Sequence, residues 1–123
     1  MAILHKENIA LTIVPSLNNE EDEVLWIKLK EKQRTCLYAC AYRTSYCDQL
    51  SGEVSKLESN IVKASSLSNS IVMFGDFNCD LNNNNPDNPT KKLVTCMKEM
   101  NLKQIINGAT RIETGEPKRI DHI

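Results

Sequence analysis

Short runs of apolar, β-branched and aromatic residues occupy much of the N-terminal third of the chain and predict β-strands. Two such runs cover residues 2–4 and 9–14. Residues 24–29 carry apolar side chains on both faces, which predicts a strand buried on at least one side. Residues 35–42 are almost continuously apolar, which is typical of a central strand. The polar residues 31–33 are predicted to form the hairpin turn between these last two strands.

The hydrophobic period changes in the middle of the chain. Apolar residues recur at spacings of three and four over residues 50–64, which predicts an amphipathic helix. Residues 71–74 form a short β-branched and aromatic strand that stops at a glycine. The Asn-, Asp- and Pro-rich run 82–88 predicts a loop. A second helix is expected over residues 90–100, with Thr90 as its N-cap.

The C-terminal part is expected to contain a short strand at 102–106 and turns at 107–108 and 114–117. The resulting order of strands, helix, strand, helix and short strands predicts a mixed α/β (α+β) fold rather than a bundle or an all-β barrel. A chain of 123 residues fits one domain, so we assign residues 1–123 to a single domain.

The net charge of -1 argues against tight non-specific binding of nucleic acid by this segment alone. A nuclease is still compatible with this charge, since a metal ion can supply positive charge locally. No apolar run approaches the roughly 20 residues that cross a membrane, and residues 1–5 are too short for the core of a signal peptide. We therefore expect a soluble protein with no membrane partner.

The five cysteines are an odd number and lack CxxC spacing, so neither a zinc site nor a disulfide framework is favoured. This usage indicates a reducing compartment, and we expect an intracellular protein that is nuclear if it is functional.

The segment from Gly75 to Asn78 carries the first candidate site. In an extended backbone, residues two apart share a face, so Asp76 and Asn78 could converge on one ligand. An Asp can activate a water, and an Asn can bind a phosphate oxygen. The alternative is an Asx-type turn, in which both side chains only cap main-chain groups. The pattern leaves both interpretations open.

Two further pairs suit phosphate chemistry. A carboxylate at Asp121 could orient the imidazole of His122 or bind a divalent cation beside it. The hydroxyl of Tyr42 and the guanidinium of Arg43, at the end of an apolar strand, could contact phosphate. Arg111 is another candidate phosphate contact. The alternatives are surface residues at a frayed terminus, a Tyr at the core boundary and solvated charges.

Taken together and in this order, Tyr42, the Gly-Asp-Phe-Asn segment and the Asp-His pair resemble the endonuclease/exonuclease/phosphatase superfamily. The chain is most similar to the endonuclease domain of non-LTR retrotransposons, which precedes a reverse transcriptase. The resemblance covers nearly the whole chain. It implies a partial four-layer α/β sandwich of the DNase I-like type and a metal-dependent phosphodiesterase that nicks DNA with Mg²⁺ or Mn²⁺.

The resemblance also implies a role for each candidate residue. Asp76 would position or deprotonate the attacking water, and Asn78 would hold the scissile phosphate. Tyr42 would contact the phosphate or the developing charge. His122 would stabilise the transition state, oriented by Asp121, which would also lie near the metal.

The sequence departs from the family pattern at both ends. The family carries an Asn and its principal metal-binding Glu in strands that precede Ala2, and a strand and loop follow its Asp-His pair. Glu7 follows the position of that Glu, so we do not assign it a metal role. We therefore expect a fragment truncated at both ends, with weak metal binding and impaired activity, whose full-length parent carries a reverse transcriptase domain.

Other functions compete with this interpretation. One is a phosphomonoesterase of the same superfamily, and another is a non-catalytic remnant that serves as an interaction surface. A thiol or zinc protein is disfavoured because the cysteines are scattered along the chain.

Overall fold

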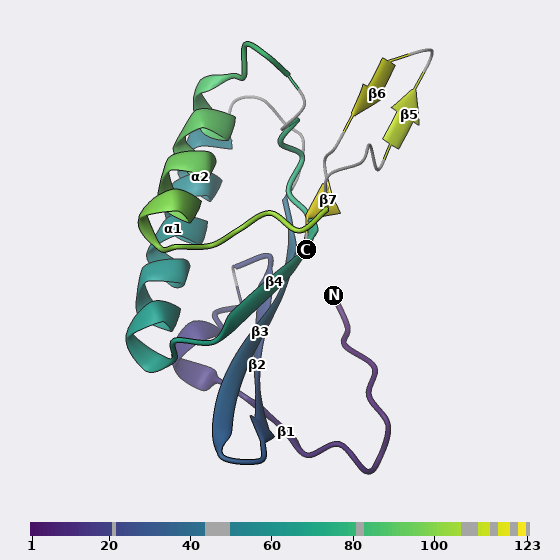
Figure 1. Cartoon of the computed structure of the whole chain (residues 1–123), viewed down its shortest axis with the longest axis vertical. Helices are drawn as coiled ribbons and strands as arrows, with labels where there is room; N and C mark the ends of the chain where they lie inside the picture. The colour runs from purple at the N-terminus through teal and green to yellow at the C-terminus, as the bar shows by residue number, and fades with distance from the viewer. Residues whose placement is uncertain are drawn as a thin grey trace.

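The computed structural model describes residues 1–20, 22–43, 50–80, 83–106, 111–113, 116–118 and 121–122. Within them, one sheet carries two helices on one of its faces (Figure 1). The elements in chain order are β1 (Leu11–Ile13), the 3-10 helix η1 (Pro15–Leu17), β2 (Val24–Glu31), β3 (Arg34–Tyr42), α1 (Leu50–Leu67), β4 (Ile71–Asp76), α2 (Asn88–Glu99), β5 (Arg111–Glu113), β6 (Glu116–Lys118) and β7 (Asp121–His122).

The described strands form a five-stranded sheet in the order β1-β2-β3-β4-β7, and β5 and β6 form a separate two-stranded sheet. β1, β2 and β3 are joined antiparallel, whereas β4 lies parallel to β3. The crossover between these parallel strands contains α1. β7 then pairs antiparallel with the end of β4. The parallel pair matters for function, because the carboxyl ends of both strands lie at the same edge of the sheet.

The hairpin of β2 and β3 confirms the predicted central strands and their turn. The register pairs Val24 with Ala41 at one end and Glu31 with Arg34 at the other. Lys32 lies in the turn with φ of 52°, in the left-handed region that tight hairpin turns use.

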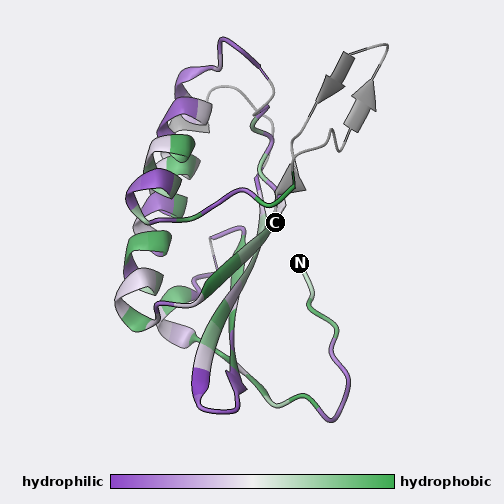
Figure 2. Cartoon of the chain, viewed as in Figure 1, coloured by the Kyte–Doolittle hydropathy of each residue, from purple (hydrophilic) through white to green (hydrophobic). Residues whose placement is uncertain are grey.

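The hydrophobic core lies between the sheet and the helices. Trp26, Leu37 and Ala39 pack with Ala64 of α1 in one cluster. In a second cluster, Ala41 and Phe77 join residues of both helices, namely Val54, Leu57, Ile61, Leu93 and Cys96. Figure 2 shows this division as apolar strands in the sheet and helices that alternate between apolar and polar surfaces. The predicted amphipathic helices are thus confirmed.

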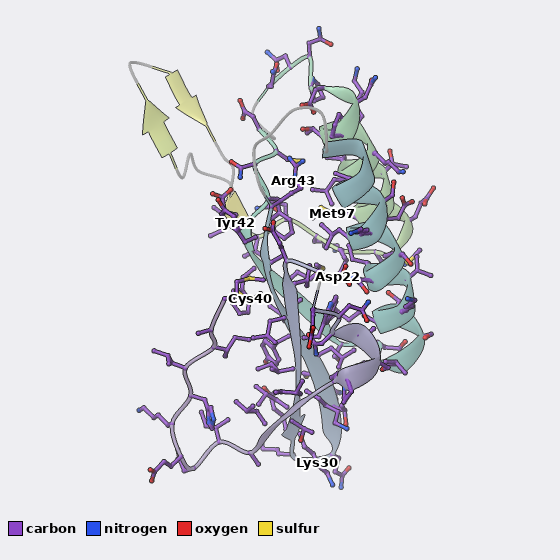
Figure 3. The ribbon with its side chains drawn as sticks, turned by 180° about the vertical axis from the view of Figure 1, so that it is seen from behind. Asp22, Lys30, Cys40, Tyr42, Arg43 and Met97 are labelled. Carbon is purple, nitrogen blue, oxygen red and sulfur yellow. The ribbon has the colours of Figure 1, made fainter. Side chains whose placement is uncertain are left out.

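Alternation along the strands places a second set of residues on the face turned away from the helices, which we call the outer face. From β2 to β4, its members are Leu25, Ile27, Leu29, Cys36, Tyr38, Cys40, Tyr42, Val72, Phe74 and Asp76. No helix of the described residues covers this face (Figure 1), and Figure 3 shows Cys40 pointing away from the helices. The five-stranded sheet and the pair of helices therefore form two layers.

Two predicted strands are wrong. Residues 2–4 and 102–106 pair with no strand in the described part of the chain. Leu4 is 95% exposed, so its apolar run has no core to join. Leu102 instead packs against the cluster beneath α2, and its N–H donates to the carbonyl of Met97. Short apolar runs do not determine whether a strand partner lies beside them, which explains both errors.

Several element boundaries also differ from prediction. α1 continues to Leu67, and β4 continues through Gly75 to Asp76. α2 begins at Asn88 with Asp87 as its N-cap, because the Asp87 carboxylate accepts a hydrogen bond from the Thr90 N–H at 2.8 Å. Thr90 is the donor of that cap and lies inside the helix. The predicted turn at 107–108 and half of that at 114–117 lie outside the described residues.

In the described part of the chain, neither helix has the combination of length and apolar character that a membrane span requires.

Candidate functional site

Four of the predicted site residues meet at one edge of the sheet. Tyr42 at the end of β3 is the register partner of Asp76 at the end of β4. On the other side of β4, Asp121 is opposite Asp76, and His122 is opposite Gly75. Three strands that are remote in sequence therefore bring these residues into adjacent positions. We call Tyr42, Asp76, Asp121 and His122 the edge row.

Gly75 allows β3 and β4 to approach each other just before the edge row. Its φ is 144°, a conformation that other residues rarely adopt. A Cβ at this position would lie 1.7 Å from the carbonyl oxygen of Ala41. A side chain cannot fit there, so glycine is required where the strand delivers Asp76.

The backbone after Asp76 turns instead of continuing as a strand. Asn78 has φ of 47°, and its N–H donates to Oδ1 of Asp76 at 2.9 Å. The expectation that both residues share the face of an extended strand is therefore wrong, and the Asx-type turn is present. Asn tolerates the left-handed region better than most residues, which explains its place in this turn. The turn also holds one oxygen of the Asp76 carboxylate in a defined position.

Arg43 connects the end of β3 to this turn. Its N–H donates to the carbonyl of Asp76 at 2.9 Å. Its Nε donates to the carbonyl of Phe77, and its Nη2 donates to the carbonyl of Asn78 at 2.7 Å and to Sγ of Cys79 at 3.2 Å. In return, Nδ2 of Asn78 donates to the carbonyl of Arg43. The two segments are thus joined in both directions.

Burial gives Arg43 a different environment from the one expected of a phosphate contact. Its side chain is 4% exposed, and its Nη1 has no hydrogen-bond partner in the described chain. Tyr42, by contrast, is 47% exposed. Figure 3 places both residues at the same end of the sheet, opposite the end that carries Lys30. Nothing in the local sequence distinguishes a buried Arg from an exposed one at such a strand end, so its tethering of the turn was not predicted.

Cys79 completes the anchoring of the turn. It is fully buried, with Phe77 beside it in the core cluster. Burial raises the pKa of the Cys79 thiol, and hydrogen bonding to Thr90 and the nearby Arg43 charge lower that pKa only in part. The thiol is therefore protonated near neutral pH and serves in packing rather than as a nucleophile.

The last predicted phosphate contact, Arg111, does not belong to the edge row. It begins β5, in the separate two-stranded sheet, with Lys118 of β6 as its register partner. The five-stranded sheet therefore does not include it.

Asp76 and Asp121 are register partners on the adjacent strands β4 and β7. The edge row therefore contains carboxylates, whose oxygens are the ligands that Mg²⁺ and Mn²⁺ prefer. Among the side chains that the structure describes, no group of three or more His, Cys, Asp or Glu residues is arranged to hold a metal ion. The carboxylates of Asp76 and Asp121 are ligands of the kind that suits a hard divalent cation.

These features define a mixed α/β fold that carries carboxylates at the carboxyl end of its parallel strands. No family model matches the chain, and no curated protein matches it. A solved structure does match: the endonuclease domain of TRAS1, a telomere-specific non-LTR retrotransposon, with a TM-score of 0.73 at 13% sequence identity. The match covers 94% of this chain and 52% of that one, so the chain spans about half the length of the matched structure. The expected fold class is confirmed.

Proposed function

We propose that the chain is part of a metal-dependent DNA endonuclease domain of the retrotransposon type, with its reaction centre at the edge row. The observation that carries the proposal is the register that aligns Tyr42, Asp76 and Asp121 on three adjacent strands, with His122 next in sequence. The shared fold with a retrotransposon endonuclease domain supports the class of activity.

A divalent cation, Mg²⁺ or Mn²⁺, would be held by Asp121, whose carboxylate oxygen is a suitable ligand. When bound, the cation supplies positive charge at the phosphate and lowers the pKa of a water. We expect weak binding, because a single protein carboxylate leaves most of the coordination sphere of the cation to water. A DNA substrate and a reverse transcriptase domain in a longer parent protein are part of the same proposal.

Asp76 would position the attacking water and accept its proton. The hydrogen bond from the Asn78 N–H restricts the rotation of this carboxylate, which favours a fixed orientation toward the water. Asn78 would hold the scissile phosphate. Its side-chain amide has two N–H donors, and the bond to the Arg43 carbonyl uses only one of them, so the second can reach a phosphate oxygen.

Tyr42 and His122 would act on the developing charge. The half-exposed position of Tyr42 allows its hydroxyl to donate to a phosphate oxygen. The imidazole of His122, oriented by Asp121, would stabilise negative charge on the pentacovalent phosphorus. Arg111 could add a contact to the DNA backbone from the separate hairpin.

Nicking of supercoiled plasmid DNA in Mg²⁺ or Mn²⁺ tests the proposal. We expect slow, metal-dependent nicking that Asp76→Asn lowers by about two orders of magnitude or more, as loss of a general base does. Glu31→Gln, at the opposite end of the sheet, should leave the rate unchanged. Nicking that persists with EDTA or survives Asp76→Asn would contradict the proposal.

A non-catalytic remnant is the second candidate, and the Asx-type turn favours it, because the side chains of Asp76 and Asn78 both bond to main-chain groups there. Calorimetric titration with Mn²⁺ separates the two functions. Saturable binding that Asp121→Ala abolishes supports the endonuclease, whereas absence of both binding and nicking supports the remnant.

A further inference from the structure

We propose that Arg43 is a positioning residue that fixes the turn carrying Asp76 and Asn78, and that it does not contact the DNA. The inference deepens the proposed function, because it concerns the residues that this function would use.

The first argument is the number of connections that converge on Arg43. Its main chain and its side chain together bond to every residue from Asp76 to Cys79. These bonds join the end of β3 to the segment that follows β4, across more than thirty positions of sequence.

The second argument is burial. A guanidinium that is 4% exposed cannot approach the backbone of a DNA duplex without leaving the core. Its bonds to carbonyls are charge-assisted and made in a desolvated site, where each is worth more than a bond between neutral groups. Loss of the guanidinium would also leave the Phe77 and Asn78 carbonyls without these donors.

The third argument is the backbone conformation of Asn78, which Arg43 restrains. Asn78 lies in the left-handed region, which costs energy for a residue other than glycine. Such a residue persists when its surroundings restrain it, and Arg43 restrains both its carbonyl and its side-chain amide. Without that restraint, Asn78 would be released toward commoner backbone conformations, and its hydrogen bond to Asp76 would be lost.

Two buried thiols provide a test that does not depend on activity. Cys79 lies in the tethered turn, whereas Cys96 lies in α2, and both are buried. Alkylation of each by iodoacetamide can be followed separately by peptide mass spectrometry. In Arg43→Met, local opening of the turn should raise the labelling of Cys79 relative to Cys96 by about tenfold or more, the amount expected from lost charged hydrogen bonds.

The chemistry of the thiol strengthens this readout. The Arg43 charge lowers the pKa of Cys79, so its removal would raise that pKa and slow alkylation of a thiol that stayed equally accessible. Faster labelling of Cys79 therefore reports opening of the turn. Arg43→Lys retains a charge and one donor group, and we expect an intermediate ratio. This variant also serves if Arg43→Met does not fold.

The matched control is Leu37→Ala, in the core cluster around Trp26. Global destabilisation should raise the labelling of both thiols together and leave their ratio unchanged. The same parallel rise in the Arg43 variants would overturn the proposal and leave Arg43 with a general structural role.

Nicking kinetics distinguish positioning from DNA contact. Positioning predicts that Arg43→Lys lowers kcat with little change in KM, whereas a phosphate contact predicts a higher KM and a weaker salt dependence. The latter result would also overturn the proposal. If no variant or parent chain nicks DNA, the proposed function fails, and the thiol ratio still decides the role of Arg43.

Discussion

At the scale of single residues, the two glycines that the structure describes have opposite environments. Gly75 combines a φ of 144° with a Cβ position inside the Ala41 backbone, whereas a Cβ on Gly52 in α1 would meet nothing within 4 Å. One glycine is required by close approach of two strands, and the other only adds flexibility to a helix. The sequence near each residue does not reveal this difference.

We therefore expect Gly75→Ala to destabilise the chain by about 4 kcal/mol or more, because backbone must move to accept the methyl group. Gly52→Ala should stabilise it by about 0.5–1 kcal/mol through the better helix propensity of alanine. Urea unfolding followed by circular dichroism measures both changes. A mild effect of Gly75→Ala would show that β3 and β4 do not approach as closely as described.

A buried thiol in α2 predicts a pH dependence of stability. Burial, followed by the Glu58 and Glu99 charges, raises the pKa of Cys96 from 9.0 to about 11. The unfolded chain therefore loses this proton at a lower pH than the folded chain, so the contribution to stability is complete below pH 9 and is lost as pH rises toward 11.

Cys96→Ala should make the free energy of unfolding fall less steeply as the pH rises from 9 toward 11. Val94→Ala, in the same helix and without a titratable group, is the control and should leave the slope unchanged. Equal slopes in the parent chain and in Cys96→Ala would contradict the prediction.

At the scale of elements, periodicity located both helices and the central strands because it reflects which side of an element is buried. Boundaries depended on particular hydrogen bonds. α2 begins two residues earlier than expected because Asp87 caps it, and Pro89 is acceptable in the first turn, where its missing N–H has no helical partner.

We expect Asp87→Ala to destabilise the chain by about 0.5–2 kcal/mol, since it removes the acceptor for the Thr90 N–H. Asp87→Ser retains a capping oxygen and should have a smaller effect. The midpoint of urea unfolding measures the difference, and equal losses in the two variants would exclude the cap as the cause.

At the scale of the whole molecule, the helices cover one face of the sheet and leave an apolar outer face. Ile13, at the edge of this face in β1, is 57% exposed. Tyr42 and Asp76 lie at the end of the same face, so the candidate site borders an apolar surface.

We expect the native chain to increase the fluorescence of the dye ANS, which binds exposed apolar surface. Ile13→Lys should reduce the increase, and Val62→Lys, at a 48% exposed position on α1, should change it less. No increase above that of an ordinary folded protein would contradict this view of the outer face.

The sequence by itself determined the fold class, both helices, the β2–β3 hairpin and the candidate residues of the edge row. These features follow from local hydrophobic periodicity and from the chemistry of individual side chains, both of which can be read directly from the sequence. Tertiary structure decided the rest. Strand register placed Asp76 between Tyr42 and Asp121, and the left-handed turn at Asn78 replaced the expected extended strand. The burial of Arg43 was also decided by the fold, because exposure depends on which distant segments pack around a side chain.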